Sequence, residues 1–294
     1  MTDPTSPTLA AGFPEGSVPR RLLDRLDRLG TELHRRGDAL ALLGLGSVGL
    51  DTHRLDEHSD ADFFVVVQDE AARERYLRAI DWLEALAPVA YSFENTPDGR
   101  KVLFADGLFA EYAVFTLEGL RAAAYPPARL VWRRDDAPEG LEAPAVPLPP
   151  AATTAAHQVG EALTNLWVGL HRDLRGERLS ATRFVQGHAV DRLVSLLGLL
   201  HPGGPGQQDP YAVERGVERR FGPDLLPLPD LAPGYDHNDR AALAILGCLE
   251  RWGSVDAEMA RQVRDLAERV RAAREERPQP GAQSSAQSST VPSR

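Results

Sequence analysis

Two aspartates, Asp60 and Asp62, stand one residue apart where a polar loop meets the apolar run 63–67. If this run is a β-strand, both side chains point to the same face, because successive residues alternate between faces. Two carboxylates that close raise each other's proton affinity unless a cation neutralises them. Mg²⁺ is usually held by one or two carboxylates together with substrate phosphates. The pair therefore predicts a magnesium site at the start of the strand.

A third acid, Glu111, lies in the alternating segment 109–116, on a face that it shares with apolar residues. A carboxylate in such surroundings needs a partner. Beside an Asp-x-Asp pair it would complete a two-metal site, either as a metal ligand or as the acceptor of a proton from an attacking hydroxyl. The alternative to a catalytic role is that Glu111 is a structural carboxylate paired with an arginine.

Gly46 and Ser47 follow the short apolar segment 38–45. A glycine lets bare backbone approach an anion closely, and a following helical turn offers N–H groups to phosphate. Arg54, in the loop between the two motifs, is either a phosphate ligand or a solvent-exposed charge. With carboxylates on one side and glycine and hydroxyl on the other, the segment predicts a cradle for a nucleoside triphosphate.

The order Gly46-Ser47, twelve residues, then Asp60-x-Asp62 at the entrance to a strand resembles the nucleotidyltransferase superfamily of DNA polymerase β-like fold. Glu111 stands where that superfamily has a later acid on a neighbouring strand. The second half of the chain looks like the smaller antibiotic-modifying members, particularly the lincosamide nucleotidyltransferases.

This resemblance implies transfer of a nucleoside monophosphate from an NTP to a hydroxyl of a small molecule, with release of pyrophosphate. By the same resemblance, Asp60, Asp62 and Glu111 would hold two Mg²⁺ ions or do the acid–base chemistry, while Gly46, Ser47 and Arg54 would bind the nucleotide. A lincosamide is the first candidate acceptor and an aminoglycoside the second. The alternatives are modification of a macromolecule, or a non-catalytic scaffold such as a regulatory or toxin–antitoxin partner.

The elements that must position these residues alternate between helical and strand patterns in the first half of the chain, and are helical throughout the second half. This predicts an α/β fold, with a small mixed-sheet domain followed by an all-helical bundle domain. Helices are expected at 19–36, 69–88 and 117–124, and strands at 38–46, 62–67, 89–95, 100–105 and 108–116. The expected domain limits are a flexible tail at 1–18, the nucleotidyltransferase domain at 19–125, a proline-rich linker at 126–150, the helical domain at 151–277 and a disordered tail at 278–294.

Several polar side chains of the helical half are ambiguous. Three arginines and a histidine there either contact a triphosphate or are solvated. Three polar residues in an apolar helix either line a cleft or form hydrogen bonds with one another within the bundle. The first group comprises His171, Arg172, Arg178 and Arg183, and the second comprises Gln186, His188 and Asp191.

Composition narrows the class of partner. The net charge of −10 argues against a nucleic-acid partner, which usually requires a basic face. The single cysteine, Cys248, cannot form an internal disulfide, and the first residues lack the features of a signal peptide. No apolar stretch is long enough to span a membrane. We therefore expect a cytoplasmic protein acting on small molecules.

Overall fold

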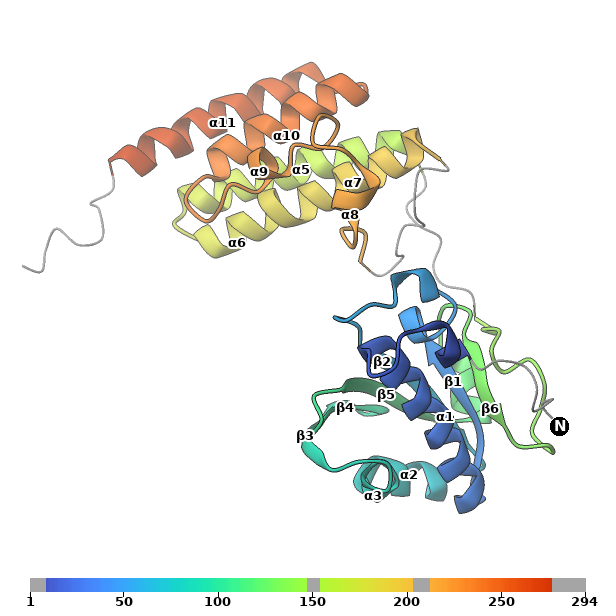
Figure 1. Ribbon diagram of the computed structural model, residues 1–294. Coiled ribbons are helices and arrows are strands. Elements are labelled where there is room, and N and C mark those ends of the chain that lie inside the picture. The colour runs from blue at the N-terminus through green and yellow to red at the C-terminus, as the bar shows by residue number, and fades with distance from the viewer. Residues whose placement is uncertain (1–8, 147–153, 203–211, 277–294) are drawn as a thin grey trace, which may run out of the picture. The chain divides into compact units, whose positions relative to one another are not determined.

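The computed structural model describes residues 9–146, 154–202 and 212–276. The chain divides into two compact units, residues 1–149 and 150–294 (Figure 1). The expected tail 278–294 lies outside the described residues, as do residues 1–8 of the expected N-terminal tail. Residues Leu9–Gly12 form a short 3-10 helix, η1, in which Ala10 is buried.

The first unit is built on a six-stranded mixed sheet in the order β3-β4-β5-β2-β1-β6. Its strands are β1 (Ala39–Leu45), β2 (Ala61–Val67), β3 (Val89–Thr96), β4 (Gly99–Phe104), β5 (Phe109–Thr116) and β6 (Arg129–Arg133). Strands β2 and β5 run parallel, and the other pairs are antiparallel. The mixed α/β class and the helical character of the second half are confirmed.

Helix α1 (Val18–Arg36) covers one face of this sheet together with α2 (Glu70–Arg78) and α3 (Asp81–Glu84). It begins where expected, because the Ser17 hydroxyl accepts a hydrogen bond from the Arg20 backbone N–H. It ends at Gly37, which has a φ of 78° and therefore suits a left-handed cap. Its leucines, spaced three and four residues apart, pack on the sheet and form the larger core of the unit.

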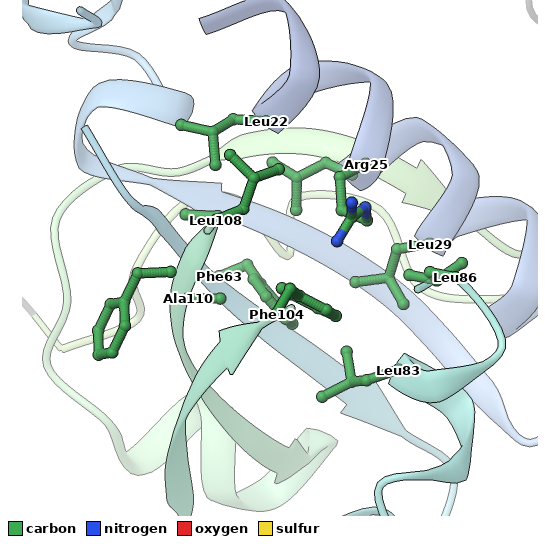
Figure 2. A pocket seen from close by; sticks show the side chains of 12 residues that line it. Leu22, Arg25, Leu29, Phe63, Leu83, Leu86, Phe104, Leu108 and Ala110 are labelled. Carbon is green, nitrogen blue, oxygen red and sulfur yellow. The ribbon is translucent and has the colours of Figure 1, made fainter. Parts of the chain in front are cut away.

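A small hollow beneath α1 shows which side chains of β2 and β5 point toward this helix. Ala61 and Phe63 of β2 and Ala110 of β5 line it together with leucines of α1 (Figure 2). Because side chains alternate along a strand, Asp62 and Glu111 belong to the opposite face. That face carries the smaller core, covered by helix α4 (Leu117–Ala122) and the segment that follows it.

Two segments of this unit differ from expectation. The single helix expected at 69–88 is interrupted at Ala79, whose extended backbone separates α2 from α3. Within the expected linker 126–150, residues 129–133 form β6 and pair with β1. A five-residue edge strand between prolines has too few residues to reveal an alternating pattern, and the proline density of its surroundings hides it.

Glu32 of α1 makes the unit's stability depend on pH. Hydrogen bonds from Arg35, and from Arg36 one turn along, lower the pKa of this nearly buried carboxyl from 4.5 to about 2. Because the pKa is lower in the folded protein than in the unfolded chain, the ionised carboxyl stabilises the fold. This stabilisation is complete at a pH above the ordinary pKa of 4.5, and it is lost as the pH falls to the folded-state pKa of about 2. We expect Glu32→Gln to cost about 2 kcal/mol at pH 7.

The cost of Glu32→Gln should shrink between pH 4.5 and 2, measured as the difference in unfolding free energy between wild type and variant. Glu15→Gln, at an exposed position, is the control and should show a small difference at every pH. A cost for Glu32→Gln that stays constant down to pH 2 would contradict the ion-pair explanation.

The second unit is a helical bundle. Helix α5 packs against α7 and α11, and α10 packs against α11 (Figure 1). The helices are α5 (Ala155–Leu174), α6 (Arg178–Thr182), α7 (Ala189–Leu200), α8 (Val217–Arg220), α9 (Leu228–Leu231), α10 (Asn238–Trp252) and α11 (Ala257–Glu275), with a π-helical stretch, η4 (Arg183–His188), between α6 and α7. None of the helices in the described part of the chain is long and apolar enough to cross a membrane.

A buried polar network ties three parts of this bundle together. Asn238 at the start of α10 donates from Nδ2 to Oδ2 of Asp173, 2.7 Å away, and both side chains are almost fully buried. Gln186 of η4 donates to the Asn238 side chain and exchanges hydrogen bonds with the backbone of Gly234. The alternative that holds for Gln186 is thus satisfaction within the bundle.

Candidate functional site

One row of residues crosses five strands of the first unit and contains two of the predicted acids. Asp62 on β2 is in register with Glu111 on the parallel strand β5. On one side of this pair, Asp62 faces Leu45 of β1, and on the other side Glu111 faces Lys101 of β4. Lys101 in turn faces Phe93 of the edge strand β3. Parallel pairing therefore brings together two carboxylates that are 49 residues apart in the sequence.

The Gly46-Ser47 turn lies against the first of these acids. Residues Gly46–Val48 form a single 3-10 turn, η2, directly after β1. Gly46 has a φ of 52°, and a Cβ atom added to it would lie 3.5 Å from Oδ2 of Asp62 and 3.9 Å from Nη2 of Arg54. Asp51 supports this arrangement, because its carboxylate pairs with Arg54 at 3.2 Å and its N–H bonds to the Gly46 carbonyl. The structure thus brings Gly46, Asp62 and Arg54 together.

Close backbone packing fixes the shape of this turn. A Cβ atom on Gly49 would lie 2.6 Å from the Gly44 carbonyl oxygen and 2.8 Å from backbone atoms of Leu45. The Val48 carbonyl accepts a hydrogen bond of 2.9 Å from Nε of Arg129, which reaches it from β6. Burial lowers the pKa of the Arg129 guanidinium. Close backbone packing at Gly49 and a hydrogen bond from the partly buried Arg129 of β6 therefore hold the turn in place.

Glu111 is engaged at both carboxylate oxygens. Asn95 of β3 donates from Nδ2 to Oε1 at 2.7 Å, and Nζ of Lys101 lies 3.1 Å from Oε2. The ion-pair alternative for Glu111 is therefore present, with lysine in place of arginine. The Asn95 Oδ1 atom is buried and has no hydrogen-bond partner.

The donor set suits a hard cation only in part. Asp60, immediately before β2, and Asp62 offer the two carboxylates from which Mg²⁺ is commonly held together with phosphate oxygens. Glu111 does not join them as a free ligand, because Lys101 and Asn95 occupy its oxygens. Among the residues that the structure describes, no three histidines, cysteines or acids are grouped so that they could hold an ion. A third carboxylate ligand would require Lys101 to move.

Three residues that contact Glu111 or the glycine turn are not predicted from the sequence: Lys101, Asn95 and Arg129. No sequence pattern predicts a role for Asn95, which precedes a turn, or for Arg129, which lies in the proline-rich segment. Lys101 did carry a signal, because it is the only lysine in the chain.

Two of the polar candidates of the second unit, Arg172 and Arg178, contact other residues of that unit. Arg172 donates to the Ser180 hydroxyl at 2.5 Å and stacks over Phe184, and Arg178 pairs with Asp236. Ser180 lies within α6, which begins at Arg178. Burial raises the pKa of the Asp191 carboxyl, and burial together with neighbouring arginines lowers the pKa of His171. These contacts favour a structural role for Arg172 and Arg178.

Known proteins show only weak similarity to this chain. No family model and no curated protein matches it. Among solved structures, an aminoglycoside 6-adenyltransferase from Bacillus subtilis is similar at 12% identity, over 85% of this chain and 96% of that one, with a TM-score of 0.27. A STING-associated CdnE c-di-GMP synthase from Capnocytophaga granulosa is similar at 8% identity, over 89% and 87% of the two chains, with a TM-score of 0.25. Neither of these similarities assigns an activity to this chain.

Proposed function

We propose that this protein transfers a nucleoside monophosphate from an NTP to a hydroxyl of a small molecule and releases pyrophosphate. The observation that carries the proposal is the pairing of Asp62 with Glu111 on neighbouring parallel strands, with the Gly46 turn against Asp62. Phosphoryl transfer needs chiefly positioning and charge stabilisation, and acids beside a glycine turn at one end of a sheet can supply both.

In this proposal the triphosphate lies over the Gly46-Ser47 turn, where the missing side chain at Gly46 lets it approach. Arg54, held by Asp51, offers its guanidinium to the phosphates. Mg²⁺ held by Asp60 and Asp62 would neutralise phosphate charge and lower the pKa of the acceptor hydroxyl. The acceptor oxygen forms a bond to the α-phosphorus as the bond to pyrophosphate breaks. The hydroxyl proton goes to Glu111 or to solvent.

The direction of attack follows from this placement. In an in-line displacement the acceptor enters opposite the leaving pyrophosphate. With the phosphates on the β1 side of Asp62, the acceptor enters from the side of β4 and β3. Tyr91 and Phe93 of β3 expose 56% and 42% of their surface there, and their rings lie 5.8 Å apart. An acceptor with an apolar ring face fits this side of the sheet.

The test is a transfer assay on the full-length chain. The protein is incubated with Mg²⁺, each of the four NTPs, and a panel of lincosamides and aminoglycosides. We expect pyrophosphate release and an acceptor heavier by one nucleotide. The proposal fails if no NTP binds in the presence of Mg²⁺ by calorimetry.

A non-catalytic role is the second candidate, and the Lys101–Glu111 ion pair is the observation that favours it. A lysine that permanently neutralises the third acid would suit a scaffold that keeps the fold without the chemistry. Calorimetry separates the two candidates, because only the transferase requires Mg²⁺-dependent binding of an NTP.

A further inference from the structure

Lysine and arginine together occupy 33 positions in this chain, and all of them except position 101, the only lysine, are arginine. The two side chains are not interchangeable. Arginine presents a rigid fork that binds carboxylates at two points, and lysine presents a compact, strongly hydrated charge on a flexible stem. The one lysine lies in the row of site residues, directly opposite Glu111. A compact ammonium is thus used at the one carboxylate that the proposed chemistry would need to free.

The contacts of Lys101 suit a bond that can be broken. Its Nζ lies 3.1 Å from Oε2 of Glu111, and the two side chains are 36% and 41% exposed. Ion pairs this open to solvent contribute little to stability, so the lysine can swing away without unfolding the strand. Glu111 would remain oriented, because Asn95 holds its other oxygen at 2.7 Å.

We propose that Lys101 is a positioning residue that occupies Glu111 in the free protein and releases it when a divalent cation enters beside Asp62. This inference rests on the proposed function. The ammonium holds the Glu111 carboxylate in place, and a doubly charged ion replaces it because oxygen ligands bind such an ion more strongly than they bind one exposed ammonium. Glu111 is then the third acid of the site only in the loaded state.

A single lysine makes the proposal directly measurable. Reductive methylation with ¹³C-formaldehyde labels the Lys101 amine and the α-amino group and leaves the positive charge of lysine in place. The Lys101→Arg variant lacks one of the two NMR signals and so assigns them. In the labelled full-length protein, saturating Mg²⁺ should shift the Lys101 signal. In Glu111→Gln, the signal should already lie near the Mg²⁺-saturated position and should no longer respond to Mg²⁺.

Paramagnetic Mn²⁺ separates failure of this inference from failure of the proposed function. Broadening of the Lys101 signal by Mn²⁺, without any Mg²⁺-induced shift, means that a cation binds nearby while the ion pair stays closed, and this overturns the inference alone. If neither ion affects the signal, no divalent cation binds, and both the proposed function and this inference are overturned.

A binding measurement gives a second readout. Lys101→Met removes the competing charge, so it should tighten Mg²⁺ binding by about two- to fivefold, the factor that an exposed ion pair corresponds to. Lys101→Arg keeps the charge and should bind Mg²⁺ as wild type does or more weakly. Unchanged or weaker Mg²⁺ binding in Lys101→Met contradicts the exchange.

Discussion

Asp62→Asn is expected to reduce nucleotidyl transfer by about a thousandfold or more, because a lost metal-binding carboxylate removes several kcal/mol of charge stabilisation. Asp62 lies at the centre of the candidate site, because it is in register with Glu111 and lies against Gly46. Asparagine has nearly the same shape, so the free energy of unfolding should change by only about 0.5 kcal/mol. The measurement is pyrophosphate release under saturating Mg²⁺ and NTP, with thermal unfolding in parallel.

Asp60→Asn should behave in the same way, because it removes the other carboxylate of the pair. The control is Asp135→Asn, an exposed aspartate of the same unit, which should keep wild-type activity. Activity that survives both Asp60→Asn and Asp62→Asn would place the chemistry elsewhere. Loss of folding in either variant would make it a structural acid.

Gly49→Ala is the second large effect. The new methyl group would meet the backbone of Gly44 and Leu45 at 2.6 to 2.8 Å, where no flexible side chain can move aside. The turn must shift, at a cost of about 1–3 kcal/mol in stability. Because Gly46 belongs to the same turn, its approach to Asp62 changes too, and transfer should fall at least about tenfold, as small misplacements at a reacting centre do.

Gly12→Ala is the matched control, since an added Cβ atom at Gly12 has no heavy atom within 4 Å and this glycine has no positive φ. It should match wild type in both unfolding temperature and transfer rate. Wild-type activity in Gly49→Ala would mean that the turn does not bind the phosphates.

Elements with a strong periodic signal could be predicted from the sequence. The leucines of α1 repeat at helical spacing between a serine cap and a glycine stop, and both ends were predicted within a residue. The break between α2 and α3 was missed, because both pieces continue one apolar pattern and only tertiary packing favours the turn at Ala79. Strand β6 was missed because its pairing with β1 is a long-range contact that leaves little local pattern.

Residues for the candidate site could be chosen from the sequence, but their contacts could not. Asp62, Glu111, Gly46 and Arg54 could be chosen because spacing and alternation act locally, and the structure brings Asp62 together with each of the others. The lysine opposite Glu111 depends on the hairpin register of β4 and β5, which the sequence does not reveal to the residue. For the same reason the sequence could not tell that the third acid is already paired.

The register of β2 and β5 also governs which changes of chain length the protein can accept. Seven consecutive pairings, Ala61 with Ala110 through Val67 with Thr116, connect these strands. One residue inserted into or deleted from either strand would turn an acid inward beneath α1 and a core side chain outward. Length variation among descendants of this chain should therefore collect in the loop between the glycine turn and Asp60, and indels within the two strands should be purged.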